Sequence, residues 1–212
     1  MFKTLLSALA IFVLSGVGSA GAETRLTLPA GVSSEIDKAG VIRPALLQKA
    51  LNAYDAHKNS VRRHDKMMIV DYAQHSSTQR LYVIDLQTGQ ATAYHVAHGS
   101  GSDKDHDGWL DAYDMKPGSG GSPRGAFVGA ETYFGKFGKA LRLDGLESEN
   151  QNSRARAIVL HSNQRYVDRA FLETHGKLGR SLGCLVVFKE ERDALIAALQ
   201  DGAFLYIDGK KS

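Results

Sequence analysis

The chain has 212 residues, of which 43% are hydrophobic and 23% are charged, and its formal net charge is +3. This length fits one domain behind a short leader, and so mild a charge excludes the clustered basic surface of a nucleic-acid-binding protein. The chain contains one cysteine, Cys184, so no intrachain disulfide can form.

Residues 1–22 have the three-part pattern of a secretory signal peptide. Lys3 gives a positive start, an apolar run extends from Leu5 to Val17, and Ala20-Gly21-Ala22 supplies small residues for cleavage. The apolar run is shorter than the about 20 residues that span a bilayer, although a retained N-terminal anchor is the alternative. We therefore predict export to the periplasm or cell envelope, with no membrane span after signal removal. An unpaired thiol kept in an oxidising compartment is either well buried or chemically useful.

Residues 23–66 are predicted to form a lead-in and one helix. Pro44 opens a helical pattern in which apolar residues recur at three- and four-residue spacing as far as Tyr54. Residues 57–66, HKNSVRRHDK, are polar and basic, and they are predicted as a solvated connection.

Residues 67–212 are predicted to form the main domain. Many short apolar and β-branched runs separated by turns, with few helices, indicate a mainly β domain with peripheral helices, in the α+β class and of sandwich or barrel type. One helix is expected over 190–200, where Asp201-Gly202 ends it. The predicted strands cover 67–73, 80–86, 91–96, 125–128, 140–143, 158–161, 185–188 and 203–207.

The long loop over 98–124 contains acidic residues with the spacing of a calcium-binding loop. Carboxylates stand at positions 1, 3, 5, 9 and 12 of this run, and Gly108 stands at position 6. Five carboxylates that converge without a cation would repel one another. Position 12 is Asp rather than Glu and no amphipathic helices flank the loop, so a solvated acidic loop is the alternative. The candidate calcium ligands are Asp103, Asp105, Asp107, Asp111 and Asp114.

Two other cofactor chemistries have weaker support. His95 and His98, with His106 nearby, could act as zinc ligands, but their spacing on a strand end places the first two imidazoles on opposite faces. The glycine-rich runs 99–101 and 118–121 lack the lysine and the following helix of a phosphate-binding loop. We therefore expect no required cofactor, with a structural calcium ion as the open option.

Two predicted strand ends each supply half of a thiol–imidazole pair. Cys184 begins one apolar run and His161 ends another. A neighbouring imidazole shifts a thiol toward the nucleophilic thiolate. Gly183 lets the backbone bend beside the cysteine, and N–H groups at such a bend are natural oxyanion donors. The alternative for Cys184 is a small buried apolar residue. His175, in the loop 174–177, is a competing base, but a strand end fixes the rotamer of His161 better.

A family resemblance adds to this interpretation. Its pieces run in order along the chain: RLYVIDL with its hairpin, HGSGSDKDHDGW, SPRGAF, ETYFGKFGKALRLDGLE, RAIVLHS and GRSLGC. Together they resemble the L,D-transpeptidase (YkuD-type) catalytic domain, in its murein L,D-transpeptidase-like branch. The resemblance implies an L,D-transpeptidase-like β-sandwich and a peptidoglycan acyltransferase that uses a cysteine nucleophile on stem peptides. We expect the protein to be a monomer.

The resemblance also implies roles for individual residues. Cys184 matches the acylated nucleophile and His161 the base, and the Ser162 carbonyl would orient the imidazole. Backbone N–H groups of Leu182, Gly183 and Cys184 would bind the oxyanion. The catalytic set is therefore Cys184, His161, Gly183 and Ser162, and the substrate-side candidates are Tyr133, Arg180, Ser181 and His175.

Three departures from the family pattern affect the substrate side. Leu182 replaces the common histidine before Gly-Cys, and Val186 replaces an arginine two places after the cysteine, which leaves Arg180 as the candidate for holding a carboxylate. The separation between His161 and Cys184 is longer than usual, so 163–175 are predicted as an insertion. Two alternatives stay open: a hydrolase of the same stems, and a catalytically idle wall-binding domain. Acceptor amine, cross-link type and β-lactam sensitivity are not predicted.

Overall fold

The computed structural model describes residues 27–210 of the chain. The predicted signal peptide, residues 1–22, lies outside these described residues. Within 27–210, no helix combines the length and the apolar character that crossing a membrane requires.

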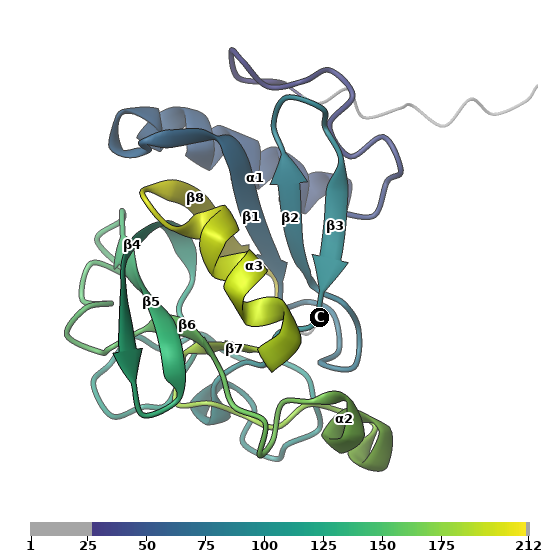
Figure 1. Cartoon of the computed structure of the whole chain (residues 1–212), viewed down its shortest axis with the longest axis vertical. Helices are drawn as coiled ribbons and strands as arrows, with labels where there is room; N and C mark the ends of the chain where they lie inside the picture. Colours follow the sequence, from purple (N-terminus) through teal and green to yellow (C-terminus); the bar gives the residue numbers. More distant parts are fainter. Residues whose placement is uncertain (1–26, 211–212) are drawn as a thin grey trace, which may run out of the picture.

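Eight strands form one mixed sheet in the order β3-β2-β1-β8-β4-β5-β6-β7. Three α-helices and two short 3-10 turns, η1 (Lys58–Ser60) and η2 (Ser100–Ser102), accompany the sheet in the described part of the chain (Figure 1). The helices are α1 (Pro44–His57), α2 (Arg169–His175) and α3 (Lys189–Leu199). The strands are β1 (Arg63–Asp71), β2 (Leu81–Asp85), β3 (Ala91–Tyr94), β4 (Gly125–Gly135), β5 (Gly138–Gly145), β6 (Val159–Ser162), β7 (Leu185–Val187) and β8 (Ala203–Asp208).

The sheet curves until its two ends meet. Ala97, just after β3, forms an antiparallel bridge with Val186 of β7, and its N–H donates to the Val186 carbonyl at 2.9 Å. One core therefore gathers side chains from both ends of the sheet, such as Leu81 of β2 and Leu160 of β6. α3 adds its apolar face to the same core (Figure 1). The predicted mainly β, α+β architecture is confirmed.

A second core lies between α1 and the other face of the sheet. Strand residues alternate between faces, so Met68 and Val70 of β1 enter the first core while Met67 and Ile69 pack against α1. Burial on both faces explains why this strand is an unbroken apolar run. α1 begins at Pro44, which lacks the N–H that would be unpaired in a first turn.

The basic segment 57–66 differs from the prediction of a solvated connection. It contains the end of α1, the turn η1 and the first residues of β1, which begins at Arg63. The Arg63 guanidinium donates to the carbonyls of Ala197 and Gln200 at 2.8 and 3.2 Å. This arginine therefore caps the C-terminal end of α3. Because Arg63 is polar, the apolar pattern did not predict that β1 begins there.

The predicted insertion 163–175 contains the helix α2. The Asp168 carboxylate caps it by accepting the N–H of Phe171 at 2.6 Å, and Gly176 ends it with a left-handed φ of 65°. The assignment of His175 to a loop was wrong, because this residue forms the last turn of α2. None of the helix's seven residues is buried, so no apolar period marks it in the sequence.

Candidate active site

Strands β6 and β7 place Cys184 and His161 on the same face of the sheet. The two strands are parallel, with Leu160 opposite Leu185 and His161 opposite Val186. Leu160 and Leu185 point into the main core, so their neighbours point to the opposite face. Val186, with Cys184 packed beside it, belongs to a separate small cluster on that face. The register thus explains why the thiol and the imidazole lie on the same side of the sheet.

The Cys184 thiol is partly buried at the start of β7. Its Sγ donates to the carbonyl of Ala157 at 3.4 Å. Burial raises the pKa of the thiol above its ordinary value, and the backbone of Val159 and the charge of Arg156 oppose that rise in pKa. Ala157 has a left-handed φ of 53°, which is uncommon for a residue with a side chain. This turn aims the Ala157 carbonyl at the thiol.

The His161 imidazole is held in one tautomer. Its Nδ1 lies 3.1 Å from the Ser162 carbonyl, and because a carbonyl only accepts, Nδ1 carries the proton. Nε2 is therefore left as the basic nitrogen. The Phe137 ring stacks on the imidazole at 4.9 Å with an interplanar angle of 18°. Burial lowers the pKa of His161, partly offset by the Ser162 carbonyl, which favours a neutral base.

The turn Ser181–Cys184 has a backbone that only glycine allows at its third position. Gly183 has a φ of 115°, and a Cβ there would lie 2.5 Å from the carbonyl oxygen of Gly121. The Ser181 hydroxyl accepts the Gly183 N–H at 3.0 Å and donates to the Cys184 carbonyl at 2.8 Å. Two observations bear on the predicted roles. The Gly183 N–H is already engaged, and Ser181 is buried at 4% exposure and supports the turn, while its contact with substrate stays a prediction.

A buried hydrogen-bonded chain of side chains, Arg80, His98 and Asp103, supports the turn Ser181–Cys184. The Arg80 guanidinium donates to His98 Nδ1 at 2.8 Å, and because it cannot accept, the imidazole proton sits on Nε2 and is donated to Asp103 at 2.8 Å. Burial lowers the pKa of His98 to about 4, which keeps the ring neutral. The His98 carbonyl accepts the Ser181 N–H at 2.9 Å, which links this chain to the nucleophile turn.

Arg156 is a site residue that the sequence analysis missed. Its guanidinium donates to the carbonyls of Gly121 and Leu182 at 3.0 and 3.3 Å, and to that of Asp114 at 2.8 Å. It thereby ties the long loop to the nucleophile turn, and its charge lowers the pKa of Cys184. The signal in the sequence that could have identified Arg156 is its position in RARAIVLHS, three residues before β6.

The remaining substrate-side candidates, Tyr133, Arg180 and His175, each contact other groups of the protein. Tyr133 lies on the β4–β5 hairpin, where the Arg142 guanidinium covers its ring at 4.7 Å. Arg180 donates to the Asp103 carbonyl. The His175 ring packs on Phe171 of the same helix at 4.2 Å. Their roles in substrate binding stay predictions.

The acidic loop gathers three of its five predicted ligands. Oxygens of Asp103, Asp105 and Asp107 lie within 4.8 Å of one another. Asp111 lies outside this group and lines a separate pocket, and the Asp114 carboxylate accepts the Lys116 N–H at 2.7 Å. The Asp103 carboxylate is also bonded to His98, which reduces what it can offer a cation. A five-carboxylate calcium site is thus not assembled, and binding at the remaining three stays a prediction.

We expect the test of calcium to be a thermal shift. If the three carboxylates bind Ca²⁺, saturating calcium should raise Tm by about 5–10 °C, because a ligand that binds only the folded state stabilises it. Asp105→Ala should remove the shift, whereas Asp193→Ala, an exposed carboxylate on α3, should keep it. An unchanged Tm of the unmodified protein at millimolar Ca²⁺ would exclude the site.

The zinc interpretation is not supported by the three imidazoles. His95 Nε2 lies 3.1 Å from the Ser77 carbonyl, His98 is bonded within its buried chain, and His106 Nε2 lies 3.1 Å from the Leu178 carbonyl. In residues 27–210, the only group of three or more ligand side chains that converge is the aspartate group.

Alkylation of Cys184 should depend on pH as a protonated thiol does. Since burial raises the pKa of Cys184 and lowers that of His161, the pair rests as thiol and neutral imidazole. We expect the iodoacetamide rate to rise with pH, with a midpoint above the ordinary thiol pKa of about 8.5. Arg156→Gln should move the midpoint higher, while Arg154→Gln, which removes an exposed arginine two positions away, should not. A midpoint below pH 7 would indicate a resting thiolate–imidazolium pair instead.

The fold and the site define a mainly β domain with a histidine on one strand and a cysteine directly before the adjacent parallel strand. The sequence profile of the L,D-transpeptidase catalytic domain (YkuD_2) matches residues 38–207, well over half of the chain. The chain belongs to this family.

Solved structures give more distant similarity. An L,D-transpeptidase from Mycobacterium smegmatis is 12% identical with a TM-score of 0.42, covering 68% of this chain and 59% of its own. One from Stackebrandtia nassauensis is 15% identical with a TM-score of 0.41, covering 84% and 76%. The helical cell shape determining protein Pgp2 from Campylobacter jejuni is 12% identical with a TM-score of 0.45, covering 81% and 58%. The chain thus spans about three fifths of the first of these proteins. No curated protein matches it.

Proposed function

We propose that this protein is an exported L,D-transpeptidase that acts on peptidoglycan stem peptides through a thioacyl intermediate on Cys184. The observation that carries the proposal is that Cys184, directly before β7 and packed beside Val186, lies on the same side of the sheet as His161 of the adjacent parallel strand β6. His161 Nδ1 is held by the Ser162 carbonyl. Membership of the L,D-transpeptidase catalytic domain family supports the reaction class.

The first half-reaction forms the thioester. The thiol hydrogen shifts from the Ala157 carbonyl to His161 Nε2, and the thiolate attacks the carbonyl carbon of the bond between the L-centre and D-Ala in a tetrapeptide stem. Backbone N–H groups of Leu182 and Cys184 bind the resulting oxyanion, because the Gly183 N–H is bonded to Ser181, and each such donor contributes roughly 10²–10³ in rate. The tetrahedral intermediate then expels D-Ala, whose amine takes the proton from His161.

The second half-reaction releases the enzyme. His161 accepts a proton from the amine of a second stem as this amine attacks the thioester carbonyl. An amide cross-link forms and the Cys184 sulfur leaves and is reprotonated. Water in place of the amine would give a carboxypeptidase. A sulfur nucleophile needs no metal, so a calcium ion in the acidic loop would have a structural role.

The proposed location is the periplasm or cell envelope. It is supported by the signal-peptide pattern of residues 1–22 and by the location of the proposed substrate. In that compartment an unpaired thiol is exposed to oxidants, and the partial burial of Cys184 and its raised pKa both reduce its oxidation.

Incubation of purified protein with muropeptides tests the proposal. New dimers together with loss of D-Ala would support transpeptidation. Trimmed monomers alone would show a hydrolase, and unchanged muropeptides would indicate a catalytically idle wall-binding domain. Mass spectrometry of the products distinguishes these three outcomes in one experiment.

A further inference from the structure

A pocket of about 390 Å³ adjoins His161 and is lined by three cationic side chains. Phe137 forms part of its wall and also stacks on the His161 ring. Ser162, whose carbonyl holds His161 Nδ1, forms another part. The cationic residues are Arg165, Lys189 and Arg192, and the name basic pocket is used below for the cavity that they line.

Among the described residues 27–210, no Asp or Glu lines the basic pocket. The Arg192 side chain is only 14% exposed, and its ion-pair partner is Asp193, which is 65% exposed and not part of the wall. Glu190 and Glu191, next to Lys189 in the chain, pair with Arg169 instead. Within residues 27–210, neither Arg165 nor Lys189 forms an ion pair. The positive charge of the basic pocket is therefore largely uncompensated.

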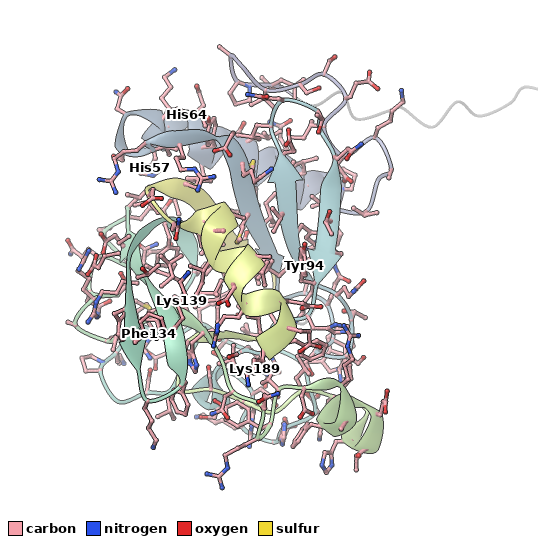
Figure 2. The ribbon with its side chains drawn as sticks, in the orientation of Figure 1. His57, His64, Tyr94, Phe134, Lys139 and Lys189 are labelled. Carbon is pink, nitrogen blue, oxygen red and sulfur yellow. The ribbon has the colours of Figure 1, made fainter. Side chains whose placement is uncertain are left out.

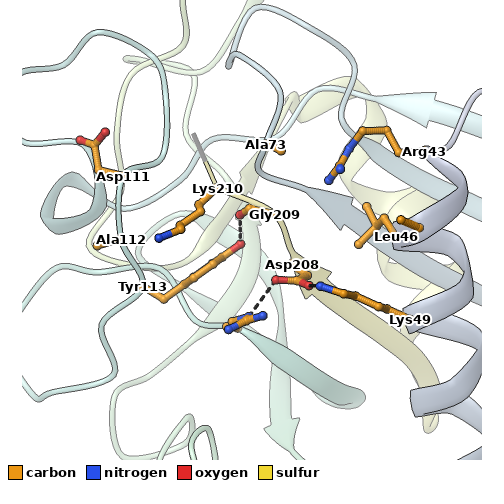
Figure 3. A pocket seen from close by; sticks show the side chains of 12 residues that line it. Arg43, Leu46, Lys49, Ala73, Asp111, Ala112, Tyr113, Asp208, Gly209 and Lys210 are labelled. Atoms are coloured by element: carbon orange, nitrogen blue, oxygen red, sulfur yellow. Dashed lines mark hydrogen bonds and ion pairs between the residues drawn. The ribbon is translucent and has the colours of Figure 1, made fainter. Parts of the chain in front are cut away.

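The larger pocket near the ends of β1 and β8 provides a contrast (Figure 3). It has a volume of about 450 Å³ and is also rich in cations. There, however, Asp208 accepts from Lys49 at 2.9 Å and from Arg124 at 2.8 Å (Figure 3). Arg43 is paired bidentately with Asp71 at 2.7 Å. Three of its cations, Arg43, Lys49 and Arg124, each have a carboxylate partner, whereas among residues 27–210 only Arg192 of the three cations in the basic pocket has one.

The basic pocket has donors suited to a carboxylate. Arginine presents a planar fork of N–H groups that matches two carboxylate oxygens, and partial burial strengthens the attraction. The Arg192 guanidinium lies 3.4 Å from the Ser162 hydroxyl, so its charge sits beside the strand end that carries the base. Gly138, with φ of 82°, lets the β4–β5 hairpin approach, because a Cβ there would be 3.1 Å from that guanidinium. Figure 2 shows Lys189 at the start of α3.

We propose that the basic pocket binds a free carboxylate of the peptide substrate and so positions the peptide against His161. The assignment rests on the proposed function, because it names a subsite for that reaction. The substrate class is a peptide with a carboxylate near the reacting bond. Arg192 and Lys189 are its binding residues, in place of Arg180, whose guanidinium is bonded to the Asp103 carbonyl.

The test compares two substrates in the full-length mature protein. One is a tetrapeptide stem with its free carboxylates, and the other is the same peptide with these groups amidated. We expect the KM of the amidated peptide to be about 10-fold higher, since a charged hydrogen-bonded pair is lost. In the double variant Lys189→Gln, Arg192→Gln, the two KM values should become equal. The kcat for the acidic peptide should stay within about 2-fold, as a purely positional binding contact predicts.

Controls separate the subsite from general charge and from folding. Lys58→Gln removes an exposed lysine of η1 and should leave the KM ratio unchanged. Lys189→Gln alone changes an exposed side chain, so it reports on the pocket even if the double variant unfolds. Calorimetry with the Cys184→Ala protein measures binding of both peptides without reaction.

Equal KM values for the two peptides in the unmodified protein would overturn the subsite while leaving the proposed function intact. If neither peptide reacts but calorimetry shows tighter binding of the acidic peptide, the subsite is supported and the proposed function is contradicted. If neither peptide reacts and calorimetry shows equal binding of the two peptides, both the subsite and the proposed function are contradicted.

Discussion

Replacing Cys184 by Ser is expected to reduce release of D-Ala from a tetrapeptide stem by at least about 10⁴-fold. Serine is nearly isosteric with cysteine, so the turn that Gly183 and Ser181 form should persist. Its hydroxyl is a far weaker acid than a thiol, and the neutral His161 imidazole would have to deprotonate it fully to produce a nucleophile. The measurement is the initial rate of D-Ala release, with the melting temperature as a check on folding.

A Cys184→Ser protein that retained its full rate with an unchanged melting temperature would contradict the assignment. The thiol would then be the small buried apolar residue that sequence alone also allowed. Because Cys184 packs partly against the cluster containing Val186, a modest loss of stability is compatible with either role and decides nothing.

Replacing His161 by Gln is expected to reduce the same rate by about 10²–10⁴-fold, the range for loss of a general base. Glutamine retains an N–H for the Ser162 carbonyl but has no basic nitrogen at the position of Nε2. The base acts in both half-reactions, so thioester formation and its resolution should both slow. Initial rates with the tetrapeptide stem measure this effect.

His175→Gln is the matched control. His175 is exposed at the end of α2 and packs on Phe171, and a substrate-side residue is not the base, so its replacement should lower the rate far less than that of His161. The reverse pattern, a silent His161→Gln and an inactive His175→Gln, would transfer the role of base to α2.

Apolar pattern was enough to predict the strands that carry the site. Leu160 and Leu185 each point into the main core, and each belongs to a short run of apolar residues that can be recognised in the sequence. Because these runs end at His161 and begin just after Cys184, the pair could be predicted before its geometry was known. The parallel register that places both on one face could not be predicted, because it depends on which strands become neighbours.

Charged residues of the site were harder to predict. Arg156 reaches the nucleophile turn because Ala157 turns the backbone into a left-handed conformation, and no periodic pattern signals such a turn. The basic pocket combines residues of the β4–β5 hairpin, of the end of β6 with the segment after it, and of α3, which are distant in sequence. In the acidic loop, the spacing of a calcium-binding loop gave five candidate ligands. The backbone places Asp111 and Asp114 outside the group that Asp103, Asp105 and Asp107 form.

Intact-protein mass spectrometry after rapid acid quenching tests the central claim, a thioacyl intermediate on Cys184, most directly. Incubation with a tetrapeptide stem should add the mass of one stem tripeptide acyl group to the protein. Digestion should place this group on the peptide that contains Cys184, and the Cys184→Ala protein should show none. Formation of cross-linked product without any adduct on Cys184, or an adduct that persists in the Cys184→Ala protein, would contradict the account.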